Sequence, residues 1–154
     1  MLCDRNKVSC EIIARSLSAL GAIVSAHNDS DQALHAVAEA EAAGKAFDAA
    51  LIDGVLPQQT ITSLGEAVQK ISAGQECRLV LLLQVDQHLR LEPYRQNGFE
   101  YYLVRPIRRR TLVQILTEVR TDDGEWLDSR LSQAIVTPAE VEAKAPPRIL
   151  LAED

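Results

Sequence analysis

The carboxylate of Asp53 is the first candidate for chemistry in this chain of 154 residues. It ends an apolar run, residues 49–52 (AALI), and is followed at once by residues 54–57 (GVLP). An apolar run of strand length that is bounded by turn residues is typical of a buried parallel strand. We therefore expect Asp53 at the carboxyl end of that strand, which is the edge where ligands and reacting groups collect in open α/β sheets.

A second candidate is the basic run of residues 105–110 (RPIRRR), in a chain whose formal net charge is −6. Arg108, Arg109 and Arg110 fall where a helix is predicted to begin, and positive charges in a first turn oppose the helix dipole. The run is therefore expected either to be solvated or to hold an anionic partner. Acidic side chains of a neighbouring domain and a phosphate-bearing ligand both fit that description.

The elements that must position these residues alternate between strand and helix. Short apolar runs predict strands near residues 1–3, 22–26, 49–53, 78–83 and 99–104. Apolar residues at helical spacing predict helices near residues 6–20, 31–43, 58–73, 86–96 and 107–120. In the first of these helices the apolar positions that recur at helical spacing are Val8, Ile12, Ile13, Leu17 and Leu20. Five successive βα units predict one α/β domain with a doubly wound parallel sheet and helices on both faces.

Composition excludes several classes of function. Hydrophobic residues make up 47% and charged residues 25% of the chain, as in ordinary globular domains. The acidic balance argues against binding to DNA or RNA polymers. No apolar run approaches the roughly 18 residues of a membrane span, so no membrane contact is expected. Three cysteines without a C-x-x-C pair indicate reduced thiols and a cytoplasmic location. Glycine-rich nucleotide loops and the common hydrolase motifs are missing from the sequence, so we expect no independent enzymatic activity.

Three segments resemble the response-regulator receiver family. Residues 53–57 (DGVLP) resemble its D-x-x-M-P loop, residues 98–106 (GFEYYLVRP) its G-A-x-D-Y-L-x-K-P segment, and residues 2–6 (LCDRN) its V-D-D-N opening. The resemblance covers residues 1–120 and implies a flavodoxin-like (βα)5 fold. Its five-stranded parallel sheet has the strand order 2-1-3-4-5.

The resemblance also implies an acidic pocket. Receivers hold Mg²⁺ with two acids after the first strand, an acceptor aspartate and a backbone carbonyl. By this resemblance Asp4 is the first acid, Asp53 the phosphoryl acceptor and Val55 the source of the carbonyl. A hard cation is needed because an acyl phosphate brings several negative charges together. A hydroxyl residue after the fourth strand and a lysine after the fifth then bind the added phosphoryl group.

This chain departs from that pattern at three positions. Arg5 replaces the second acid, Leu83 the hydroxyl residue and Arg105 the lysine. Arg5 places a repelling charge where a metal ligand belongs, so Mg²⁺ binding should be weak or lost. Arg5 or Arg105 would then pair with Asp53. The resemblance therefore points to a degenerate receiver (a pseudo-receiver) with a vestigial acceptor, and the alternative is a receiver that is phosphorylated on Asp53 by a phospho-histidine.

A partner or ligand face is also implied, on the fourth helix, fifth strand and fifth helix. Its expected residues are Tyr102, Val104, Arg105, Pro106, Arg108, Arg109 and Arg110. Tyr102 matches the family's switch aromatic, and a half-buried strand tyrosine is the alternative. Some similar pseudo-receivers bind partner domains or cyclic dinucleotides. Cyclic di-GMP is thus one candidate ligand, because an arginine beside Tyr102 and Pro106 is suited to stacking on guanine and holding its phosphates.

The last part of the chain has a different composition. Residues 121–147 are acidic, contain three prolines and predict a linker. Residues 148–154 (RILLAED) resemble the receiver opening again and are expected to begin a following receiver that is cut short. Tandem receivers resemble the tail of a hybrid sensor histidine kinase. The kinase core and the following receiver of the same parent are therefore the expected partners of a domain that is regulatory and not itself an enzyme.

Overall fold

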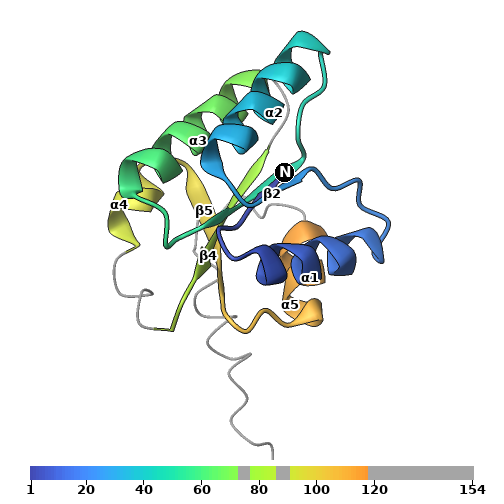
Figure 1. The fold of residues 1–154 in the computed structure, drawn as a ribbon. Helices are drawn as coiled ribbons and strands as arrows, with labels where there is room; N and C mark the ends of the chain where they lie inside the picture. The colour runs from blue at the N-terminus through green and yellow to red at the C-terminus, as the bar shows by residue number, and fades with distance from the viewer. Residues whose placement is uncertain (73–76, 86–90, 118–154) are drawn as a thin grey trace, which may run out of the picture.

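The computed structural model describes residues 1–72, 77–85 and 91–117 (Figure 1). Its strands are β1 (Leu2–Cys3), β2 (Ala26–His27), β3 (Ala49–Asp53), β4 (Arg78–Leu83) and β5 (Phe99–Val104). Its helices are α1 (Lys7–Ser18), α2 (Ser30–Ala42), α3 (Gln58–Ile71), α4 (Glu92–Arg95) and α5 (Arg109–Thr117). The predicted linker and the predicted strand after it lie outside the described residues, so both stay predictions. No helix in the described ranges is long and apolar enough to cross a membrane.

The five strands form one parallel sheet in the order β2-β1-β3-β4-β5, which confirms the predicted doubly wound topology. β3 and β4 lie near the centre of the sheet and are apolar apart from Asp53 at the end of β3 and Arg78 at the start of β4, because helices cover both of their faces. Alternate side chains enter two separate cores. α2, α3 and α4 cover one face of the sheet, and α1 and α5 cover the other (Figure 1).

β3 and β4 end at the same edge of the sheet, with Asp53 opposite Leu82. The chain turns there at Gly54, whose N–H donates to the Leu82 carbonyl over 2.8 Å. A Cβ atom on Gly54 would lie 2.7 Å from the Leu83 side chain and 3.0 Å from that carbonyl. A larger residue after Asp53 would therefore force Leu83 or the backbone of β4 to shift, because both pack directly on Gly54.

Two details of local structure refine the expectations from sequence: α1 forms as predicted but buries only part of its apolar positions, and the predicted bounds of the second strand were wrong. In α1 the buried residues are Cys10, Ile13 and Leu17, whereas Val8 and Ile12 are 66% and 59% exposed. At 100° per residue the latter two point away from the sheet, so α1 is apolar on both of its sides. The second strand covers Ala26–His27 and not residues 22–26. It is an edge strand whose pairing is limited by its single neighbour, the two-residue strand β1.

Candidate functional site

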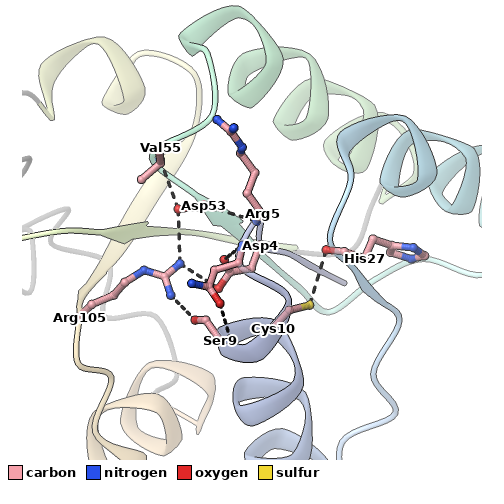
Figure 2. A network of polar contacts seen from close by, with 9 residues as sticks. Asp4, Arg5, Ser9, Cys10, His27, Asp53, Val55 and Arg105 are labelled. Carbon is pink, nitrogen blue, oxygen red and sulfur yellow. Dashed lines mark hydrogen bonds and ion pairs between the residues drawn. The ribbon is translucent and has the colours of Figure 1, made fainter.

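Three charged residues from distant parts of the chain meet at the carboxyl edge of the sheet (Figure 2). Asp4 directly follows β1, Asp53 ends β3, and Arg105 directly follows β5. Asp4 is fully buried and Asp53 is 3% exposed. β1 and β3 are neighbours in the sheet, so two carboxylates are placed side by side in a buried position.

The guanidinium of Arg105 lies between the two carboxylates. Its Nη2 donates to Asp4 Oδ2 over 2.9 Å and to Asp53 Oδ1 over 3.3 Å. Its Nη1 donates to the hydroxyl of Ser9 in the first turn of α1. The Arg105 N–H also donates to the Leu83 carbonyl over 2.8 Å, which fixes the backbone from which this side chain extends. Since the Arg105 side chain is only 20% exposed, these charged hydrogen bonds are largely shielded from water.

Backbone N–H groups donate the remaining hydrogen bonds to the oxygens of the two carboxylates. Asn6 N donates to Asp4 Oδ1 over 3.0 Å. Val55 N donates to Asp53 Oδ1 over 3.2 Å, and Arg5 N donates to Asp53 Oδ2 over 3.3 Å. Every oxygen of both carboxylates therefore accepts at least one hydrogen bond from the protein. Buried charges need this kind of compensation to be tolerated.

The side chain of Arg5 does not take part in this cluster. Arg5 is exposed, and in Figure 2 its side chain extends away from both aspartates. Of the two arginines that the sequence offered as partners for Asp53, the structure brings Arg105 to the carboxylate. Arg5 contributes its backbone N–H instead.

Ser9 is the member of the cluster that the sequence did not single out for this role. It lies in the first turn of α1, where the side-chain oxygen of Asn6 accepts its N–H over 3.0 Å and caps the helix. α1 begins shortly after β1, so its first turn must lie near the carboxyl edge of the sheet. The sequence signal that could have identified Ser9 was a hydroxyl residue in the first turn of the helix that follows Asp4.

Magnesium does not fit the residues present. A hard divalent cation prefers several oxygen ligands, commonly carboxylates. Among the described residues, no group of three or more acidic, histidine or cysteine side chains is placed to hold a metal ion. The oxygens of Asp4 and Asp53 that face one another already accept hydrogen bonds from Arg105. A cation between them would have to displace the guanidinium.

The two thiols near this site, those of Cys3 and Cys10, have raised pKa values and therefore low reactivity. Burial, and next the charge of Asp53, raise the pKa of the Cys3 thiol to about 12. Burial likewise raises the pKa of Cys10, whose Sγ lies 3.6 Å from the His27 carbonyl oxygen. Because the thiolate is the reactive form, neither cysteine is a candidate nucleophile near neutral pH.

The structure divides the predicted partner face into two parts. Arg105 belongs to the carboxylate cluster, and Tyr102 is half-buried against the core on the α2–α3 side of the sheet. Val104, Pro106 and Arg108 are exposed. Arg109 and Arg110 are also exposed and form the start of α5, whose first turn contains no acidic residue. We call Arg109 and Arg110 the arginine face.

Comparison with known proteins shows similarity in fold. No family model and no curated protein sequence matches the chain. A response regulator from Burkholderia pseudomallei with a phosphorylated aspartic acid and a calcium ion superposes with a TM-score of 0.61 and 17% identity, covering 91% of this chain and 75% of that one. The chemotaxis protein CheY4 of Vibrio cholerae gives 0.60 and 18%, covering 77% and 95%.

The receiver domain of a sensor histidine kinase from Pseudomonas aeruginosa, with a magnesium ion in its active-site cleft, is also similar. It superposes with a TM-score of 0.57 and 26% identity, covering 75% of this chain and 90% of that one. The structural neighbours are thus CheY-like receiver domains from response regulators and from a histidine kinase. This chain has the doubly wound, five-stranded parallel fold of those domains.

Proposed function

We propose that residues 1–120 are a non-catalytic regulatory pseudo-receiver of a two-component phosphorelay, within a hybrid histidine kinase. The observation that carries this proposal is the Arg105 guanidinium bonded to both Asp4 and Asp53. An internal cation at this position does what a bound metal ion does for the resting carboxylates: it offsets their charge. It cannot also neutralise an added phosphoryl group, which brings about two further negative charges.

The surroundings of Asp53 also disfavour phosphoryl acceptance. To attack phosphorus, one carboxylate oxygen must leave its hydrogen bonds, and both are held by backbone N–H groups. Asp53 is 3% exposed, so a donor would have to open the site first. Leu83 supplies no hydrogen-bond donor for a phosphoryl oxygen and is itself buried in the core. Asp53 therefore acts as a structural carboxylate that holds Arg105 and two backbone segments together.

Control of the parent then depends on surfaces and not on phosphorylation. The domain docks on the kinase core or on the following receiver and stabilises one state of the parent. A ligand or partner at the arginine face shifts that equilibrium by the difference between its affinities for the two states. Cyclic di-GMP remains a candidate for that ligand because Arg109 and Arg110 are exposed cations without an acidic neighbour in their helical turn.

Phosphorylation of the isolated chain should fail. After incubation with acetyl phosphate and Mg²⁺, we expect the intact mass of the protein to be unchanged. Restoring the family's residues in an Arg5→Asp, Leu83→Thr, Arg105→Lys variant should permit addition of one phosphoryl group. Addition of one group to the natural chain, and its loss in Asp53→Asn, would establish the alternative of a working receiver.

Removing the internal cation should destabilise the fold. Arg105→Met keeps the length of the side chain but leaves two buried carboxylates without a counter-charge, which should lower the free energy of unfolding by about 3–5 kcal/mol. Mg²⁺ should recover part of that loss and should have little effect on the natural chain. Urea unfolding with and without Mg²⁺ measures both effects, and Arg109→Met, at an exposed position, is the matched control. Equal stability of the Arg105→Met variant and the natural chain would contradict the assigned role.

Regulation through the arginine face can be tested in the full-length parent. Arg109→Ala with Arg110→Ala should change autokinase activity, because the docked state loses two charged contacts. Lys45→Ala with Lys70→Ala removes two exposed cations elsewhere and should leave the activity unaltered. Equal basal and stimulated activity in both double variants and the natural parent would count against docking through this face.

The cyclic dinucleotide can be tested directly by calorimetry. Titration of cyclic di-GMP into the full chain should release heat that disappears in the Arg109→Ala, Arg110→Ala variant, since phosphate binding depends on these guanidinium groups. An absence of heat up to high micromolar concentrations would eliminate this ligand. It would leave docking of a protein partner as the function of the face.

A further inference from the structure

We propose that the outer side of α1 is a self-association surface, on which a second copy of this chain docks its own α1 in antiparallel orientation. The outer side consists of five exposed residues, Val8, Glu11, Ile12, Arg15 and Ala19. It is separate from the arginine face, so the pairing goes beyond the proposed function and does not rest on it. Three features carry the proposal: a stripe of exposed apolar side chains, its continuation past the end of the helix, and charges that complement those of a second copy.

The apolar stripe lies on the side of α1 that points away from the sheet. The buried positions of the helix are Cys10, Ile13 and Leu17. At about 100° per residue, Val8 and Ile12 both lie within about 50° of the opposite direction and are one helical turn apart. Their side chains are more than half exposed, so α1 leaves adjoining apolar surface in water. Covering such surface is favourable by about 25 cal/mol per Å², which supplies the driving force for docking.

Exposed apolar residues continue beyond the end of α1. Leu20 is exposed and Ile23 is fully exposed, in a loop that projects from the side of the molecule (Figure 1). Val8 and Ala19 lie about 16 Å apart along the helix, near its two ends. An antiparallel second copy, centred on the middle of the stripe, brings the Val8 end of each helix against the Ala19 end of the other. The twofold symmetry therefore covers both apolar ends at once, with the same surface used by each copy.

The charges of Glu11 and Arg15 favour the antiparallel orientation. Both side chains are exposed, and neither forms an ion pair with another described residue. In the antiparallel pair, Glu11 of each copy lies beside Arg15 of the other, which gives two reciprocal ion pairs. In a parallel pair each of these residues would face its own counterpart, and like charges would repel. The apolar stem of Arg15 can meanwhile lie against Ile12 of the second copy.

The size of this surface determines how tightly two copies can pair. With 12 residues, α1 is about 18 Å long. One helix side from each copy buries less than the roughly 1,200 Å² at which stable interfaces begin. We therefore expect a reversible pairing that depends on protein concentration, and the share contributed by the exposed ion pairs should fall as salt is added.

Sedimentation velocity of the full chain, at protein concentrations up to the millimolar range, measures the pairing. The weight-average mass of the natural chain should rise toward twice that of one chain as the concentration increases. Glu11→Arg alone and Arg15→Glu alone should each raise the dissociation constant about tenfold, because each replaces two ion pairs by two contacts between like charges. Ile12→Ser should also weaken the pairing. Lys45→Glu makes the same change of charge as Arg15→Glu at an exposed position after α2, and as the control it should have no effect.

Mixing the two charge variants distinguishes pairing from damage to the fold. An equimolar mixture of Glu11→Arg and Arg15→Glu chains should dimerise again, because each contact then joins opposite charges. A natural chain that stays monomeric at millimolar concentration would overturn the proposal. Self-association that is equal in the natural chain and in both charge variants would also overturn it, because the interface would then lie elsewhere. None of these measurements involves phosphorylation or the arginine face, so failure of this proposal and failure of the proposed function are distinguishable.

Discussion

The contact between Arg105 and the two buried aspartates is the constraint on which the carboxyl edge of this sheet depends. Asp4 and Asp53 come from neighbouring strands and are almost fully buried, so their charges would repel strongly if left unpaired. One guanidinium compensates both, and backbone N–H groups satisfy their remaining hydrogen-bonding capacity. Breaking such a buried pair costs about 3–5 kcal/mol, which is a large share of the stability of a small domain.

A covalently attached cation differs from a metal ion in a way that bears on signalling. A bound metal exchanges with solvent, and its occupancy responds to concentration and to other ligands. The Arg105 guanidinium is part of the chain and cannot leave the site by exchange with solvent. The cation position between the two aspartates is therefore always filled, so its occupancy cannot change in response to a signal. In the proposed function, any signal therefore reaches this domain at its surface, which is why we propose the arginine face as the site of regulation.

The sequence was sufficient for the fold because the apolar runs and the helical spacing are strong in the central elements. Asp53 was placed correctly, since β3 is buried on both faces and ends where the apolar run ends. The partner of Asp53 was not decided by sequence, because Arg5 and Arg105 are both long enough to reach it. The path of the backbone after β1, where Asp4 Oδ1 accepts the Asn6 N–H, leaves the Arg5 side chain exposed. Periodicity predicted the helix α1 correctly but did not show which of its sides is buried, because the helix is apolar on both sides.

The same cluster joins the two helices that carry the exposed features of this domain. Ser9 belongs to α1, whose solvent side presents Val8 and Ile12, and Arg105 lies just before the arginine face at the start of α5. The start of α1 cannot move away from the segment before α5 without breaking a contact to a buried arginine. We therefore expect these two surfaces to behave as one rigid unit. Binding of a partner to α1 would then promote binding of an anion at the start of α5 only if both prefer the same arrangement of this unit. The reason is that coupling between two binding sites requires differential affinity for two states.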